Sequence, residues 1–346
     1  MTDSIRLGVL GTGQMAQTMV AAVRHVPGCD VVAIASRDAS RAQSIAATLG
    51  IARHFGSTDA LLADPDLDAV YIANENRFHA AATITALDAG KAVLCEKPFA
   101  ASVAEGEAVR EAVRRSGRLF MEAVTTPFLP SVVHALHVAA SGSIGAIRHL
   151  AADFGYPTTP QTHAAAWRRD GGVLLDRAIY PITLARLALG PIREAKVQVV
   201  RNADGLDTDA ALLLTHADDS VSLLAASLTS LLANSMTIAG ARGSVIVDAP
   251  LLAAETVRVT HAEPRATGGE GGRAARLKQI GLLRRARSML QSLKAPHIGF
   301  GASPYVHVMA HFRDLYRARA TASPVLPIEL SLEVLTVIER AARGEG

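Results

Sequence analysis

The chain has 346 residues, of which 49% are hydrophobic and 19% charged, and its formal net charge is +3. This length allows about two domains of ordinary size, and this composition excludes a disordered chain. The charge is unevenly spread, because the segment 264–295 carries eight basic residues and one acid, so the rest is mildly acidic. That balance argues against general nucleic-acid binding.

The two cysteines, Cys29 and Cys95, lie in apolar, strand-like surroundings. We therefore expect no disulfide framework, and a reducing compartment, the cytoplasm. The N-terminus lacks a basic region and leads directly into a strand, so no signal peptide is expected. The uncharged stretch 220–241 has the length of a membrane span, but it contains eight serine, threonine and asparagine residues, which would sit unpaired in lipid. It is expected to form two strands of a packed sheet, and no membrane partner is expected.

Residues 1–123 alternate short apolar strands with helices, which predicts an α/β Rossmann domain with a doubly wound parallel sheet. The strands are expected at Ile5–Leu10, Asp30–Ala35, Ala69–Ala73, Ala92–Cys95 and Leu119–Glu122. The helices are expected at Gln14–Val26, Ser40–Leu49, Asp59–Ala63, His79–Ala89 and Val103–Ser116.

In residues 124–346, consecutive strands joined by turns replace the alternation of strand and helix. This pattern predicts an α+β domain with a largely antiparallel open sheet, and we expect it to serve substrate binding and oligomerisation. Its strands are expected at Ile147–Phe154, Lys196–Arg201, Asp209–His216, Val221–Ser227, Ser235–Ala239, Ser244–Val247 and Thr256–Thr260. Helices are expected at Ser131–Ala140, after Gly171-Gly172, and at Leu330–Arg343. The basic segment at about 264–295 has helical leucine spacing; it is interpreted as an amphipathic insertion, with a lid over a phosphorylated substrate or a membrane-surface helix as alternatives.

A glycine-rich turn, Gly11-Thr12-Gly13-Gln14-Met15-Ala16, follows the first strand and opens the first helix. Gly11 permits the tight turn, Gly13 lets a pyrophosphate approach the backbone, and Ala16 keeps helix and strand close. Because strand, turn and helix stand in the required order, the turn predicts dinucleotide binding.

The end of the second strand is where the dinucleotide is selected, and an acid there would favour NAD. The sequence instead has Ser36-Arg37, with Arg41 one helical turn further on. Two guanidinium groups suit a 2′-phosphate, so NADP(H) is predicted. Asp38 could serve as the acid slightly out of register, which leaves NAD(H) possible.

The combination of Gly11–Ala16, Ser36-Arg37, Glu96-Lys97-Pro98 and Gly171-Gly172 with Asp176 and Tyr180 resembles the glucose–fructose oxidoreductase, inositol dehydrogenase and rhizopine catabolism (Gfo/Idh/MocA) family over essentially the whole chain. It looks closest to the branch of dimeric dihydrodiol dehydrogenase and NADP-dependent sugar dehydrogenases and reductases.

The resemblance implies a site between the two domains. Lys97, before a Lys–Pro bond that is often cis in such enzymes, would lie beside the nicotinamide and the substrate oxygen. Tyr180 would donate or accept the proton, with a pKa lowered by the Lys97 charge, and Asp176 would orient the lysine or the substrate. Helical i, i+4 spacing would place Asp176 and Tyr180 on one face, with a kink at Pro181. The expected cofactor-binding residues are Gly11, Gly13, Gln14, Met15, Ser36, Arg37, Arg41, Asn74, Asn76, His79, Glu96 and Lys97.

Three departures from the family pattern concern the substrate and the cofactor, and one of them is that Thr125 and Pro127 replace the aromatic residue and the arginine expected after Met121-Glu122-Ala123. The segment Asn74–His79 keeps its histidine but lacks the usual proline. Arg177 replaces a smaller or apolar residue beside Asp176, which suggests contact with an anionic substrate. Phe154 and Trp167 are further candidates for the substrate pocket.

These features predict an oxidoreductase that moves a hydride between NADP(H) and a carbonyl or alcohol carbon of a sugar, cyclitol or related small ketone or polyol. The alternatives are a redox-neutral lyase or glycosidase that retains its nucleotide, and a ligand-binding sensor without chemistry. The resemblance also implies a homodimer or homotetramer formed through the C-terminal sheet. No metal site is expected, because the pairs His134/His137 and His307/His311 have helical spacing but no third ligand.

Overall fold

The computed structural model describes residues 4–158, 171–262 and 296–345. Its first sheet has the order β3-β2-β1-β4-β5-β6, and every neighbouring pair is parallel. The strands are β1 (Ile5–Leu10), β2 (Cys29–Ala35), β3 (Arg53–Phe55), β4 (Ala69–Ile72), β5 (Ala92–Cys95) and β6 (Phe120–Glu122). This doubly wound sheet confirms the predicted Rossmann fold. The sequence analysis missed β3, which is only three residues long and not fully buried.

Five helices connect these strands: α1 (Gln14–Val23), α2 (Ala39–Leu49), α3 (Thr58–Leu62), α4 (His79–Asp88) and α5 (Val103–Ser116). Local signals define α5 at both ends. The hydroxyl of Ser102 accepts from the Glu105 amide, and the Glu105 carboxylate accepts from the Ala101 amide. Gly117 then ends the helix in the left-handed conformation. Such reciprocal capping, together with a terminal glycine, stops a helix from fraying.

The second sheet has the order β13-β12-β11-β7-β10-β9-β8. Its strands are β7 (Ile147–Gly155), β8 (Ile192–Arg201), β9 (Asp207–His216), β10 (Val221–Ser227), β11 (Met236–Gly240), β12 (Gly243–Val247) and β13 (Val257–His261). All neighbours are antiparallel except β7 and β10, which confirms the largely antiparallel sheet. The stretch 220–241 forms β10 and β11, as expected, and among the described helices none has the length and hydropathy to cross a membrane.

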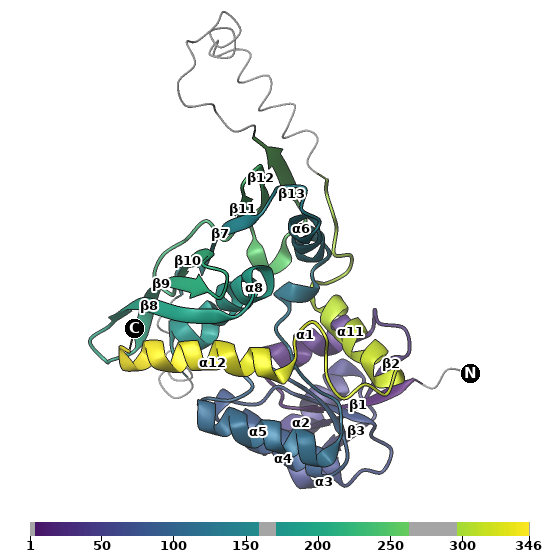
Figure 1. The fold of residues 1–346 in the computed structure, drawn as a ribbon. Helices are drawn as coiled ribbons and strands as arrows, with labels where there is room; N and C mark the ends of the chain where they lie inside the picture. The colour runs from purple at the N-terminus through teal and green to yellow at the C-terminus, as the bar shows by residue number, and fades with distance from the viewer. Residues whose placement is uncertain (1–3, 159–170, 263–295, 346) are drawn as a thin grey trace, which may run out of the picture.

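Among the described residues of the C-terminal half, the α-helices are α6 (Pro130–Ala140), α8 (Ile179–Leu189), α11 (Tyr305–Arg317) and α12 (Ile328–Arg343). Figure 1 shows α12 lying between the second sheet and the Rossmann unit. It is linked to α8 by an ion pair of 2.6 Å between Glu333 and Arg186. On its other side it approaches α5 so closely that a Cβ at Gly106 would lie 2.7 Å from Leu332. The last helix therefore ties the two halves together.

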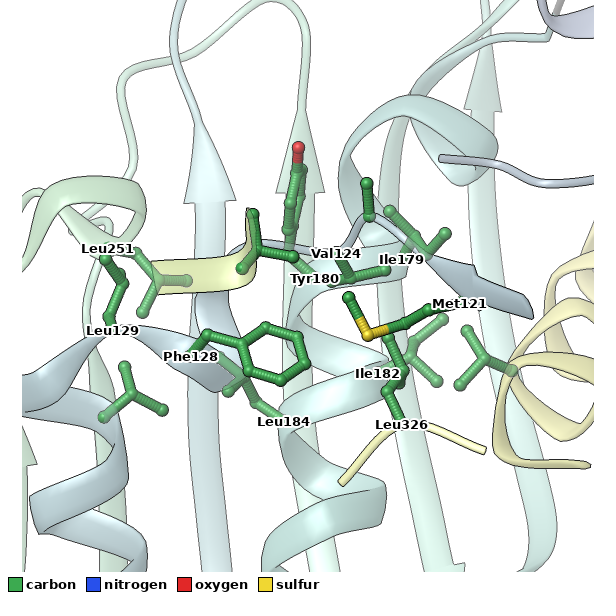
Figure 2. Packing of buried hydrophobic residues seen from close by; sticks show 14 of the residues in the cluster. Met121, Val124, Phe128, Leu129, Ile179, Tyr180, Ile182, Leu184, Leu251 and Leu326 are labelled. Carbon is green, nitrogen blue, oxygen red and sulfur yellow. The ribbon is translucent and has the colours of Figure 1, made fainter. Parts of the chain in front are cut away.

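Apolar side chains fill the junction between the halves. Figure 2 shows Met121 of β6 and Val124, which follows that strand, packed near Ile179 and Ile182 of α8. Tyr180 borders this cluster, and its hydroxyl points away from the apolar side chains. Cys29 and Cys95 are buried and unbridged, as predicted.

Candidate active site

The turn from β1 into α1 forms an open cradle. Gly11 has φ +123°, and a Cβ there would collide with the Ala73 carbonyl, so only glycine fits. At Gly13 a Cβ would meet no described atom within 4 Å, and no side chain caps α1. The first turn of α1 also carries no acidic residue. Uncapped N–H groups at the positive end of a helix favour phosphate, so this cradle fits a dinucleotide.

A cleft of about 870 Å³ opens beside this cradle. Its predicted lining residues are Gly11, Gly13, Ser36, Arg37, Arg41, Asn74 and Asn76, and those missed by the sequence analysis include Thr12, Thr58, Asp59, Glu75, Phe78 and Thr85. Gln14, Met15, His79, Glu96 and Lys97 are not among the lining residues. Of these, Thr12 stands between the two motif glycines, Thr58 and Asp59 begin α3, and Thr85 lies within α4, where no motif distinguishes it.

Arg37 lies at the mouth of the cleft with a side chain that is 72% exposed. Its guanidinium forms an ion pair of 2.8 Å with Glu75 and stacks 4.9 Å from the Phe78 ring centroid. Arg77 makes the same two kinds of contact, at 2.7 Å and 4.6 Å, but does not line the cleft. Glu75 therefore holds two arginines, only one of which faces the nucleotide cleft.

Asp38 is the N-cap of α2. Its Oδ1 accepts from the Arg41 amide at 3.0 Å and from the Ser40 hydroxyl at 2.6 Å. The Ser40 hydroxyl, followed by the Arg41 amide, lowers the pKa of this carboxyl. Oδ1 of Asp38 is therefore used to cap α2, which makes Asp38 less suited to bind the ribose hydroxyls of NAD.

The segment after β4 is braced by His79. One ring nitrogen lies 2.7 Å from the Pro98 carbonyl and the other 3.1 Å from the Asn74 carbonyl. His79 is only 1% exposed, so it holds the segment beside the cleft in place from within the protein interior. Asn74 lies on the same segment and lines the cleft, and its buried Oδ1 accepts no hydrogen bond from the described residues. A buried oxygen of this kind suits a donor from a bound nucleotide.

Lys97 joins the two halves of the molecule. Its Nζ lies 2.8 Å from Oδ1 of Asp176 and donates to the Asp176 carbonyl at 2.9 Å. The same ammonium is 5.2 Å from the ring centroid of Tyr180, and this ring also meets Phe154 in an edge-on contact with centroids 5.3 Å apart. The structure therefore brings together the three residues proposed for catalysis, and the Lys97–Pro98 bond is cis, as the resemblance implies.

The backbone around Asp176 differs from the expected regular helix. Leu174–Ala178 is a π-helical turn, and α8 begins only at Ile179. Pro181, in the first turn of α8, has no N–H to offer the preceding carbonyls, which favours such an irregular junction. The expectation of an α-helical i, i+4 pair with a kink at Pro181 is therefore wrong, although both side chains still reach Lys97.

The Gly171-Gly172 pair lets this turn approach β9. A Cβ at Gly172 would overlap Asp207, and Gly171 has φ +101°. Oδ2 of Asp207 then accepts from the Leu174 amide at 2.9 Å. The close approach fixes where the turn begins and so positions Asp176.

Burial has the largest influence on the pKa of Tyr180 and so on its protonation at neutral pH. Burial raises the pKa of its phenol above the ordinary value, and the opposing influence of the Lys97 charge is smaller. For Lys97, burial alone would lower the pKa, but Asp176 and Tyr180 raise it overall. The expectation that Lys97 brings the pKa of Tyr180 below its usual value is wrong for this state, because desolvation outweighs the nearby charge. At neutral pH the site holds an ammonium and a neutral phenol.

Two buried carboxyl groups support the Lys97 segment. Oε1 of Glu96 accepts from the Tyr71 hydroxyl at 2.5 Å, and burial raises the pKa of Glu96. Oε1 of Glu122 accepts from the Phe99 amide at 3.0 Å, two residues past Lys97. The sequence analysis did not single out Tyr71 or assign Glu122 a role, since a lone residue inside an apolar strand resembles core.

Burial raises the pKa of Glu122 to about 7. A carboxyl group whose pKa is raised by folding contributes stability at low pH, and this contribution is lost as pH rises through the folded value. We expect wild-type unfolding free energy to fall relative to that of Glu122→Gln between about pH 5 and pH 8, by up to about 3 kcal/mol. Denaturant titrations across this range measure the difference. The exposed Glu111→Gln serves as control, and parallel pH profiles for wild type and Glu122→Gln would contradict the assignment.

The substrate candidates have different environments. Phe154 is 6% exposed and contacts Tyr180, beside the site. Arg177 is 1% exposed and donates to main-chain carbonyls of the protein. Trp167 and the basic segment at about 264–295 lie outside the described residues.

The paired histidines on α11 have partners within the protein. His307 lies 2.9 Å from the Phe300 carbonyl, and His311 lies 2.9 Å from the Ser323 hydroxyl. Within the described ranges, no group of three or more metal-ligating side chains occurs.

Comparison with known proteins identifies the family. Residues 5–124 match the family model described as "Oxidoreductase family, NAD-binding Rossmann fold", and residues 132–246 match the GFO/IDH/MocA C-terminal domain. Trans-1,2-dihydrobenzene-1,2-diol dehydrogenase from Bos taurus is 33% identical over 244 residues, 69% of this chain and 73% of that protein. The enzyme of the same name from Homo sapiens is 34% identical over 249 residues, covering 70% and 74%.

Solved structures share the fold over nearly the whole chain. A 3-ketoreductase from Actinomadura kijaniata, crystallised with NADP and TDP-benzene, gives a TM-score of 0.76 at 23% identity, covering 99% of this chain and 98% of that one. An aldose-aldose oxidoreductase from Caulobacter crescentus gives 0.79 at 20% identity, covering 98% of each. This chain belongs to the GFO/IDH/MocA family and is an oxidoreductase.

Proposed function

We propose that this oxidoreductase transfers a hydride between NADP(H) and a carbonyl or alcohol carbon of a sugar, cyclitol or related small ketone or polyol. One observation carries the proposal: Lys97 from the Rossmann half meets Asp176 and Tyr180 from the other half. Lys97 follows β5, which pairs with β4, and β4 ends at the nucleotide cleft. The reacting oxygen would therefore sit between the domains.

Each residue has a role that follows from its state. Tyr180, a neutral phenol, donates the proton to the substrate oxygen during reduction and takes it back during oxidation. Lys97 places a positive charge beside that oxygen as negative charge develops on it. Asp176 holds the ammonium in position. A bound nicotinamide supplies or accepts the hydride.

The preference for NADP(H) is supported by the cleft. Ser36, Arg37 and Arg41 line it together, and Asp38 is engaged as a helix cap. Relatives of this fold were crystallised with either nucleotide: the 3-ketoreductase with NADP, and an oxidoreductase from Agrobacterium radiobacter with NAD+. The arginines of this chain favour the former.

The substrate class is supported by the relatives' names, a dihydrobenzenediol dehydrogenase and sugar-directed enzymes. A panel with NADPH should contain aldoses, inosose-like ketones and vicinal dicarbonyls, and with NADP⁺ trans-1,2-dihydrobenzene-1,2-diol. We expect net nucleotide turnover with at least one member. Substrate conversion without net nucleotide consumption would favour a redox-neutral enzyme, and saturable binding without conversion would favour a sensor. The free, buried cysteines are consistent with the proposed cytoplasmic location.

The outer face of the second sheet is proposed to pair two copies of the chain. Along β10 the side chains alternate, so Leu224 is 4% exposed while Leu223 is 57% exposed. Leu213 of β9, 38% exposed, lies opposite Leu223. Ser227, the last residue of β10, is buried and bonded to Asp209, so it is not part of this exposed strip. An apolar strip on an open sheet suits a homodimer, or a tetramer built from it.

Replacing Leu223 by Asp should shift the chain from its assembly to a monomer of 36.2 kDa, because a carboxylate would be buried in an apolar interface. Light scattering at micromolar concentration measures the mass. Leu231→Asp, at a 75% exposed leucine outside the strands, is the control and should leave the mass unchanged. If light scattering shows the wild-type chain to be a monomer, the proposed pairing through the second sheet is wrong.

A further inference from the structure

Arg177 is held rigidly beside the catalytic residues without lining the nucleotide cleft. One terminal nitrogen donates to the Tyr156 carbonyl at 2.6 Å and to the Ser227 carbonyl. The guanidinium lies over the Tyr156 ring, with its carbon 3.8 Å from the ring centroid. These contacts, and an exposure of 1%, fix the group and shield it from solvent.

One donor of this buried cation remains unused. Nε of Arg177 has no hydrogen-bond partner among the described residues. It lies 3.6 Å from Oδ2 of Asp176, about 0.7 Å beyond an ordinary N–H···O bond. Buried charged donors are rarely left without an acceptor, so this near contact calls for an explanation.

Asp176 therefore stands between two cations. Oδ1 is bonded to Lys97 at 2.8 Å, while Oδ2 approaches Arg177. The Asp176 side chain is 31% exposed, and rotation about the last bond of an aspartate is soft. A small rotation can strengthen the contact with one cation while weakening the contact with the other.

We propose that Arg177 is a positioning residue that takes up the Asp176 carboxylate when a substrate oxygen engages Lys97. The inference rests on the proposed function, in which Lys97 acts on that oxygen. An ammonium paired closely with a carboxylate offers less positive charge to a third group. Moving the carboxylate toward Arg177 releases that charge for the substrate, and it does so without leaving a partly buried carboxylate unpaired.

The test compares Arg177→Met, which keeps bulk but no charge, with Arg177→Lys, which keeps a cation. The assay uses NADPH and whichever compound of the panel the wild type turns over fastest. We expect Arg177→Met to lower kcat about tenfold or more, with little change in KM or NADPH affinity, and Arg177→Lys to recover most of the loss. Arg186→Met, which breaks the ion pair between α8 and Glu333 of α12, is the matched control and should keep wild-type kcat.

The most informative measurement is the kcat of a double variant that combines Arg177→Met with Asp176→Asn. If Arg177 acts through Asp176, the double variant loses no more kcat than Asp176→Asn alone. Additive losses, or wild-type kcat in Arg177→Met, would overturn the inference. So would a raised KM with unchanged kcat in Arg177→Met, because that result assigns Arg177 to direct substrate contact.

One replacement variant and two parallel variants make the outcome of the test unambiguous. Should Arg177→Met not fold, Arg177→Gln replaces it, since its amide can still donate to the two carbonyls without a charge. Lys97→Met and Tyr180→Phe are assayed in parallel. Wild-type turnover in both would reject the proposed function itself, whereas inactive controls beside a fully active Arg177→Met would reject only the role of Arg177.

Discussion

Tyr180→Phe should lower turnover by about 100- to 10,000-fold, the usual loss when a positioned proton donor is removed. The hydroxyl points away from the apolar cluster while the ring packs within it, so phenylalanine should keep the fold. Steady-state turnover and NADPH affinity, measured by nucleotide fluorescence on the same preparations, separate chemistry from binding. NADPH affinity should stay close to that of wild type.

Lys97→Met belongs to the same prediction and should cause a comparable loss. Without the ammonium, nothing offsets charge on the substrate oxygen, and Asp176 loses its bonded partner. Because both residues act on one oxygen, the double variant should be little worse than either single one. Retained activity in Tyr180→Phe would assign proton transfer to Lys97 alone.

Arg37→Ala should weaken NADPH binding by about 1.5–3 kcal/mol and leave NADH binding nearly unchanged, because a charge-assisted contact to the 2′-phosphate is lost. The phosphate must compete with Glu75 for this guanidinium, which places the expected effect below that of an unpaired arginine. Titrations with both nucleotides measure the discrimination directly.

Arg77→Ala is the matched control for this change. Arg77 also pairs with Glu75 and stacks on Phe78, yet it does not line the cleft. Its removal should leave NADPH affinity intact. Equal weakening of NADPH and NADH by Arg37→Ala would show that the end of β2 does not select the nucleotide.

The fold was largely predictable because its signals are local. Buried parallel strands give continuous apolar runs, and glycine and N-cap residues mark where helices start and stop. Two elements were not predicted, β3 and α11, and β3 is too short for any pattern. The return of α12 to the Rossmann unit was not predicted, because it depends on contacts such as that between Leu332 and Gly106, far apart in sequence.

The candidate site was predictable only in part. Lys97, Asp176 and Tyr180 came from a resemblance and meet in space as it implied. The buried environment of Tyr180 was not predictable, since desolvation depends on side chains from several elements. The same holds for Arg177, where sequence suggested substrate contact and the structure shows bonds to two carbonyls.

The central claim is that net redox chemistry occurs between Lys97 and Tyr180 at a bound, exchangeable nucleotide. The most direct measurement follows nicotinamide absorbance while the purified chain, stripped of bound nucleotide, converts a panel substrate with excess NADPH. The account predicts that many equivalents of NADPH per chain are oxidised, matched by reduced product, and that Tyr180→Phe nearly stops the reaction. Product formation without NADPH loss, or undiminished NADPH oxidation by Tyr180→Phe and Lys97→Met, would contradict it.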